Sequence, residues 1–177
     1  MTTQLLSGHF VRFFDADDHL VAAASEFLRE GLESGCTCVA LATAPHREGI
    51  NASLAALGFN PAALESRYQY IPLDARTMLA NFVHDHRLDR HRFHETIGLL
   101  MRQAAARGQP VRIFGEMVGM LATEASLESA IELEELWNEL SRQQAFLLLC
   151  GYSRAALGDD IVGEKRRHIC AVHSGVM

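Results

Sequence analysis

The feature that most constrains the fold is an alternation of short apolar runs with longer segments of helical periodicity. Apolar runs of about four to eight residues predict buried strands, and apolar residues recurring every three or four positions predict amphipathic helices. Such alternation favours a mainly parallel sheet with helices on both faces, so we expect a three-layer α/β fold. The expected strands are 9–14, 36–43, 68–73, 111–114, 145–150 and 170–173, and the expected helices follow residue 15 or 17 and cover 46–57, 90–107, 126–142 and 159–167.

Capping and turn residues set the limits of these elements. Asp15 or Asp17 can cap the first helix, and Gly35 is a good residue to end it. Residues 74–89 show neither pattern clearly. We expect a single domain over residues 1–177, because no linker or repeat interrupts the chain.

Charge and hydropathy exclude several classes of protein. The chain has 16 Lys and Arg against 22 Asp and Glu, which gives a net charge of -6 and no basic block. We therefore expect no binding to nucleic acid or to an anionic membrane surface. No apolar run approaches the roughly 18 residues of a membrane helix. The first residues, MTTQLLSGHF, lack the features of a signal peptide, so we expect a cytoplasmic protein.

The cysteine and histidine spacings do not predict a metal site. None of the four cysteines forms a CxxC pair, and we expect reduced thiols that pack as small apolar residues. Cys150 and His173 remain candidates for a thiol–imidazole pair, although nothing near them favours an activated thiol. His84, His86, His91 and His94 are interrupted by arginines and predict a solvated face rather than a metal site. We expect no cofactor.

The turn after the first expected strand cannot cradle a phosphate. In parallel α/β folds ligands bind beyond the carboxyl ends of the strands, so this turn is the first place to look. A phosphate-binding loop uses glycines and usually a lysine. Residues 14–19 contain neither, and Asp15, Asp17 and Asp18 place three carboxylates there.

Other residues at strand ends are candidates for ligand contacts. Glu116 follows the fourth expected strand and can accept hydrogen bonds from a ligand or metal; alternatively, it is a first-turn carboxylate stabilised by the helix dipole. Phe14 and Asp15 end the first strand and are placed to line the same pocket. Tyr152 follows the fifth strand and either lines this pocket or packs in the core. His9, at the opposite end of the first strand, is either a ligand contact or a structural histidine.

Several segments together resemble known families. The stretch Phe27 to Leu32 with Gly35 and the following apolar run is similar to the region after the phosphate loop of KaiC and RecA-like ATPases, but the loop itself is missing. Further positions in order along the chain are His9, Phe13-Phe14, Gly108, Arg112, Gly115-Glu116-Met117, Glu134, Cys150-Gly151-Tyr152 and His173.

The order and spacing of these positions resemble the MEDS family, the methanogen/methylotroph DcmR sensory domain, across nearly the whole chain. The resemblance implies a degenerate RecA-like domain that senses small molecules such as hydrocarbon derivatives and regulates a histidine kinase or transcription regulator. It adds His173 to the candidate ligand contacts, beside His9, Phe14, Asp15, Glu116 and Tyr152. Family members are often fused to such outputs, which this sequence lacks, so we expect a partner protein or a homodimer.

Three functions remain in competition. The leading interpretation is a non-enzymatic sensory domain, because no GxSxG, HExxH or Cys-His arrangement predicts hydrolysis. An interaction adaptor without a small-molecule ligand would instead use the exposed helix faces, such as the acidic side of the helix 126–142. A residual nucleotide-binding ATPase is disfavoured by the missing phosphate loop.

Overall fold

A parallel sheet of six strands forms the centre of the computed structural model, which describes residues 7–158 and 163–177. Every pairing within this sheet is parallel, and the strand order is β3-β2-β6-β7-β1-β8. The expected α/β fold with a mainly parallel sheet is therefore confirmed. The strands are β1 (Gly8–Phe14), β2 (Thr37–Ala42), β3 (Tyr70–Asp74), β6 (Val111–Gly115), β7 (Leu147–Ser153) and β8 (Gly175–Val176).

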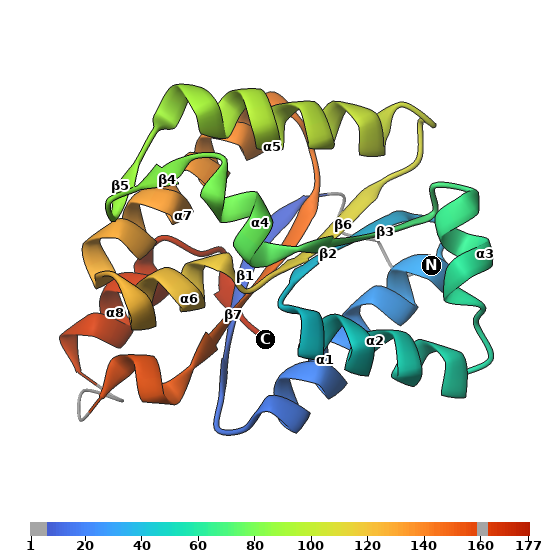
Figure 1. Ribbon diagram of the computed structural model, residues 1–177, viewed down its shortest axis with the longest axis horizontal. Helices are drawn as coiled ribbons and strands as arrows, with labels where there is room; N and C mark the ends of the chain where they lie inside the picture. Colours follow the sequence, from blue (N-terminus) through green and yellow to red (C-terminus); the bar gives the residue numbers. More distant parts are fainter. Residues whose placement is uncertain (1–6, 159–162) are drawn as a thin grey trace.

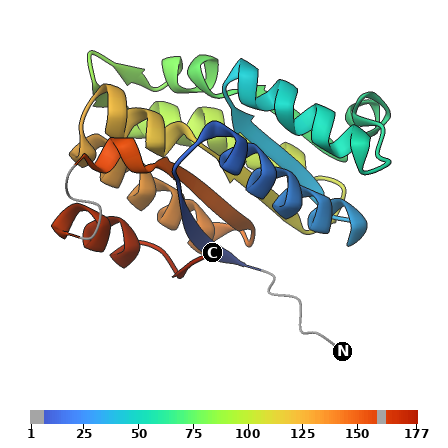
Figure 2. The ribbon, with the colours of Figure 1, turned by 90° about the horizontal axis from the view of Figure 1, so that it is seen from below.

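Helices cover both faces of the sheet (Figure 1). On one face α1 and α2 lie against the strands, and Figure 2 shows them in front of the sheet. On the other face α4, α5, α6 and α7 bury a second apolar cluster. The helices are α1 (Asp17–Glu33), α2 (Ala44–Ala56), α3 (Pro61–Ser66), α4 (Ala75–Ala80), α5 (Arg90–Ala105), α6 (Met117–Glu124), α7 (Leu127–Gln143) and α8 (Glu164–Ala171).

The apolar pattern of each strand explains its place in the sheet. Every residue of β2 and β6 is buried, which matches their nearly continuous apolar sequences and their position between other strands. In β1 the side chains alternate more strongly between buried and accessible positions. Successive side chains of a strand point to opposite faces, so His9 and Val11 share a face with Phe13. That face lies under α7.

The termini of several elements differ from the sequence-based expectation. Ala16 is the N-cap of α1 and makes no side-chain capping bond, while Asp17 lies in the first turn, where a negative charge favours the helix dipole. Residues 74–89 form α4 and a hairpin of β4 (Val83–His84) and β5 (Arg87–Leu88). The short helices α3 and α6 were not predicted.

The end of the chain corrects one prediction. We expected a strand at 170–173, but Cys170 lies in α8, and the last strand is β8 beside β1. The short apolar run 170–173 fits a strand or the end of a helix equally well, and the tertiary contacts decide between them. The expected helix 159–167 begins at Glu164 in the part that is described; residues 159–162 lie outside the described residues. Within the described chain, every helix is too short or too polar to cross a membrane.

Candidate functional site

A cavity of about 470 Å³ lies at the carboxyl ends of the central strands. We call it the strand-end cavity. It is the kind of crevice in which open parallel α/β sheets hold their ligands. Its walls come from the ends of β2, β6 and β7 and from α1, α2, α4 and α6. The lining residues used below are Asp17, Leu20, Thr43, His46, Arg76 and Glu116.

Glu116 is the central polar group of this cavity. It is buried at the end of β6 and stands at the N-cap position of α6, but its side chain makes no capping bond there. Its carboxylate instead reaches the β2–α2 junction. One oxygen accepts a hydrogen bond from the backbone N–H of Thr43, and Oε2 lies 2.7 Å from Nδ1 of His46. The carboxylate therefore ties the ends of two neighbouring strands together.

The charges around His46 favour its protonated form. The hydrogen bond with Glu116 raises the pKa of His46, burial opposes this, and the negative charges of Glu116 and Asp17 raise it further. Nε2 of His46 lies 3.5 Å from the exposed Asp17 carboxylate. Arg76 and Glu124 form a two-point ion pair, with distances of 2.7 and 3.0 Å, at the rim. The cavity thus has a buried carboxylate paired with a partly buried imidazole, and an exposed charged rim.

A close approach of backbone fixes α6 beside the cavity. A Cβ atom added at Gly119 would lie 2.5 Å from the carbonyl oxygen of Gly151, far inside van der Waals contact. Only glycine allows α6 to pack this closely on β7. Both glycines line the cavity, together with the apolar side chains of Leu20 and Met120.

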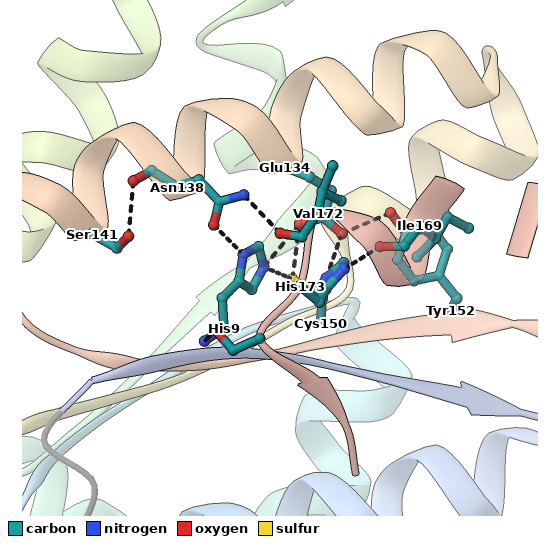
Figure 3. Close-up of polar contacts among 10 residues, drawn as sticks. His9, Glu134, Asn138, Ser141, Cys150, Tyr152, Ile169, Val172 and His173 are labelled. Atoms are coloured by element: carbon teal, nitrogen blue, oxygen red, sulfur yellow. Dashed lines mark hydrogen bonds and ion pairs between the residues drawn. The ribbon is translucent and has the colours of Figure 1, made fainter. Parts of the chain in front are cut away.

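A second group of polar side chains lies away from this cavity, buried between the sheet and α7. We call it the buried His–Glu–Cys cluster; it consists of His9, Glu134, Cys150 and His173 (Figure 3). His9 comes from β1, Cys150 from β7, Glu134 from α7 and His173 from the segment after α8. The side chains of Glu134 and His173 are both fully buried.

The ligand-type atoms of this cluster converge. Nε2 of His9 lies 3.0 Å from Oε2 of Glu134 and 3.2 Å from Sγ of Cys150. Sγ of Cys150 is 3.4 Å from the same carboxylate oxygen. On the other side, Oε1 of Glu134 lies 3.1 Å from Nε2 of His173 and accepts a hydrogen bond of 2.8 Å from the hydroxyl of Tyr152.

A second layer of contacts orients both imidazole rings. The side-chain N–H₂ of Asn138 donates to the carbonyl of Val172 at 2.7 Å, so its oxygen faces His9. That oxygen is 2.9 Å from Nδ1 of His9, which must therefore carry the proton and donate it. Nδ1 of His173 likewise donates to the carbonyl of Ile169 at 2.6 Å. In the neutral rings, both Nε2 lone pairs then point into the cluster.

Burial and neighbouring groups perturb the acids of this cluster. Burial alone would raise the pKa of Glu134, but imidazoles of His173 and His9 that direct an N–H at the carboxylate outweigh burial and lower the pKa to about 2. Burial, reinforced by the Glu134 charge, raises the pKa of the Cys150 thiol and of the Tyr152 hydroxyl well above their usual values. Without a cation, the carboxylate is therefore the only anionic group of this set at neutral pH.

The structure divides the predicted site residues between different places. Glu116 lines the strand-end cavity. Phe14 is buried in the core beneath α1, and Asp15 is exposed, with its carboxylate 3.3 Å from Arg154. His9, Tyr152 and His173 meet around Glu134 on the α7 side of the sheet. The six residues do not share one pocket.

Sequence reasoning did not name several residues of both places as ligand contacts, although Glu134 was among the positions of the family resemblance. His46 comes directly after Pro45, just beyond the end of a strand. This position was a usable signal that its polar side chain faces the strand-end cavity. Glu134 stands on the apolar side of α7 between Leu133 and Trp137, so an acidic residue on a buried face was also a signal. The sequence gives no signal for Asn138, because an asparagine on a helix usually faces solvent.

Comparison with known proteins identifies the family. The profile of MEDS, the methanogen/methylotroph DcmR sensory domain, matches residues 8–174. A search of curated proteins gives no match. The match begins at β1, ends just beyond His173, and includes both the strand-end cavity and the buried His–Glu–Cys cluster. The chain therefore belongs to the MEDS family of sensory domains.

Proposed function

We propose that this protein is a non-enzymatic sensory domain that binds a small organic molecule in the strand-end cavity. The observation that carries the proposal is the pair of the buried Glu116 carboxylate and the partly buried His46, which faces a cavity of about 470 Å³. That volume lies within the range of roughly 300–1,000 Å³ typical of small-molecule sites. Apolar walls with a few convergent polar groups are also typical of such sites.

The chemistry of the cavity favours a small ligand that donates a hydrogen bond. Both oxygens of Glu116 are already engaged, one by a backbone N–H and one by His46. A hydroxyl or amine of a ligand would compete with His46 for Oε2, while its carbon part would contact Leu20 and Met120. Small alcohols and amines fit this description and belong to the hydrocarbon derivatives that the family resemblance suggests.

Such a ligand would act by shifting a conformational equilibrium. Glu116 joins β6 to the β2–α2 junction, so a ligand that displaces His46 would change how α2 is held. A ligand shifts the population only by as much as its affinity for the two states differs. We propose that a signalling protein, either a histidine kinase or a transcription regulator, reads the position of α2 and α6; a second copy of the chain is the alternative reader.

The absence of a phosphate cradle supports the non-enzymatic interpretation. The turn after β1 places the carboxylates of Asp15, Asp17 and Asp18 on the surface, where they would repel the anionic phosphates of a nucleoside triphosphate. Calorimetry with ATP and magnesium tests this point. Tight, magnesium-dependent binding would favour a residual nucleotide-binding domain over the sensory function.

The main experiment is an NMR titration of the ¹⁵N-labelled protein with methanol, methylamine and dichloromethane as separate probes. We expect saturable shifts of the backbone amides of Thr43, Gly119 and Gly151, which surround the cavity. Glu116→Gln keeps the shape of the side chain but removes its charge. It should weaken the binding of whichever probe binds to the wild-type protein at least tenfold. Glu26→Gln, on the exposed side of α1, is the matched control and should bind normally.

If no probe shifts these amides, and native mass spectrometry shows no co-purified organic molecule, the strand-end cavity is not a sensory site. The adaptor function would then be favoured, and pull-down of partners would be the next measurement.

A further inference from the structure

We infer that the buried His–Glu–Cys cluster is a binding site for one divalent transition-metal ion, with zinc the best match to its ligands. The four ligand atoms are Nε2 of His9, an oxygen of Glu134, Sγ of Cys150 and Nε2 of His173, and they lie within 4.8 Å of one another. Imidazole, thiolate and carboxylate are the groups that bind zinc in proteins. This inference is independent of the strand-end cavity.

The distances fit a tetrahedral ion. Zinc–nitrogen and zinc–oxygen bonds of about 2.0–2.2 Å and zinc–sulfur bonds of about 2.3 Å place neighbouring ligand atoms roughly 3.3–3.8 Å apart. Within the cluster, Nε2 of His9 is 3.2 Å from Sγ of Cys150, and that sulfur is 3.4 Å from Oε2 of Glu134. An ion bound to these three atoms therefore requires only small outward shifts, and Nε2 of His173 lies within 4.8 Å of each of them.

The second layer of contacts has the form that metal sites use. Ligating histidines donate their other ring N–H to a carbonyl or carboxylate, which fixes the tautomer and aims the free lone pair at the ion. His173 donates to the carbonyl of Ile169, and His9 donates to the side chain of Asn138. Asn138 is itself fixed by the carbonyl of Val172.

One atom of the cluster lacks a partner, as expected for a metal ligand. Nε2 of His173 is buried and makes no hydrogen bond, although it lies 3.1 Å from the Glu134 carboxylate. In the neutral ring, the lone pair of this nitrogen faces a carboxylate oxygen and is repelled by it. Buried polar atoms are almost always satisfied, and a cation between the two would satisfy both.

Charge balance also favours an ion. With both rings protonated, two imidazolium groups with centroids only 4.2 Å apart would share a single buried carboxylate. With a divalent ion, the Glu134 carboxylate and the Cys150 thiolate supply two negative charges and the rings stay neutral, so the net charge is zero. Binding converts the thiol to a thiolate, and its proton leaves to solvent. Buried charges are retained where they are paired or coordinate a metal.

Four protein ligands without an open position are typical of a structural metal site. The ion would join β1, β7, α7 and the segment after α8. That segment is already held by the backbone N–H of Ser174, which donates to the carbonyl of His9. We therefore expect the ion to hold the C-terminal segment against the sheet.

The test uses the full chain, stripped with a chelator, with Co²⁺ as a spectroscopic probe and Zn²⁺ as competitor. We expect one equivalent of Co²⁺, a thiolate-to-cobalt charge-transfer band and displacement of the cobalt by one equivalent of Zn²⁺. Cys150→Ser should remove that band. The matched control is Cys38→Ser, a buried cysteine in the other apolar cluster, which should keep it.

Asn138→Ala keeps the test valid if substitution of a ligand prevents folding. It leaves all four ligands in place and removes only the contact that orients His9, so the affinity should fall by about 10–100-fold. The inference is overturned if wild-type protein binds less than a stoichiometric amount of either ion. It is also overturned if the charge-transfer band is absent, or if binding is unchanged in the folded His173→Gln and Cys150→Ser variants.

Discussion

The strand-end cavity and the buried His–Glu–Cys cluster are built from similar groups but differ in access to solvent. In each, a buried carboxylate from one element meets imidazole from another: Glu116 with His46, and Glu134 with His9 and His173. The cavity has an exposed rim that includes Asp17, so it is open to solvent. In the cluster both the carboxylate and the His173 ring are fully buried. The same kinds of side chain thus line an open cavity in one place and form a closed cluster in the other.

The sharpest test of this comparison is removal of the carboxylate from the cluster. Glu134→Ala leaves two imidazoles and the Tyr152 hydroxyl without their shared partner, and breaking a buried ion pair costs about 3–5 kcal/mol. We expect the free energy of unfolding, measured by urea denaturation of metal-free protein, to fall by this amount. Glu135→Ala, on the exposed side of the same helix, should change it by less than about 0.5 kcal/mol. If both substitutions lowered the free energy of unfolding equally, the buried contacts of Glu134 would not stabilise the fold more than an exposed position on α7.

The next largest effect concerns the wall of the cavity. Gly119→Ala places a Cβ against the Gly151 carbonyl, and overpacking of this kind costs about 1–3 kcal/mol. Gly98→Ala is the matched control in α5, because its Cβ would meet only the mobile end of Arg102, at 3.3 Å. There the gain in helix propensity should leave stability unchanged or slightly raised. Thermal unfolding distinguishes the two, and a neutral Gly119→Ala would show that α6 can move away from β7.

A smaller effect is expected from the pH dependence of His46. Its pKa is raised, so its protonated form is stabilised on folding, chiefly by Glu116 and further by Asp17. This contribution is complete below the unfolded pKa of histidine and is lost as pH rises through the raised pKa of the folded state. His46→Gln should flatten that part of the stability profile, measured by denaturation across pH. The exposed His91→Gln is the control, and an equal flattening there would assign the dependence elsewhere.

The smallest effect should come from the rim of the cavity. Arg76 and Glu124 are both well exposed, and exposed ion pairs contribute about 0.2–1 kcal/mol or less. A double-mutant cycle with Arg76→Ala and Glu124→Ala should give a coupling energy in this range. A coupling well above it would mean that the rim, like the cluster, is a stabilising part of the fold.

Much of the fold could be predicted because it depends on local patterns. Apolar runs in the sequence predicted the strands β2, β6 and β7. Segments of helical periodicity predicted the helices α1, α5 and α7. The last strand could not be predicted, because β8 is a two-residue pairing with β1 that leaves no period to detect. The short helix α6 was missed because periodicity alone cannot distinguish a buried helix from a buried strand in so short an apolar run.

The candidate sites were only partly predictable. Glu116 was found from its position after a strand, which is a local signal. His9 was noted at the start of the first strand, and His173 as a possible partner of Cys150 and from the family resemblance, but nothing in the sequence joined the two histidines. The histidine cluster that does stand together in sequence is different: His84, His86 and His91 are exposed, and no converging group of ligand atoms forms there among the described residues.

The sequence by itself determined the α/β class, the family and the strand-end position of Glu116, because periodicity and motif order are properties of neighbouring residues. Only the tertiary structure brought His9 and Cys150, which are 141 positions apart, into contact. Parallel pairing of β1 with β7 sets their side chains on one face, and α7 then places Glu134 above them. That juxtaposition depends on strand order and helix placement, which no local pattern of residues specifies.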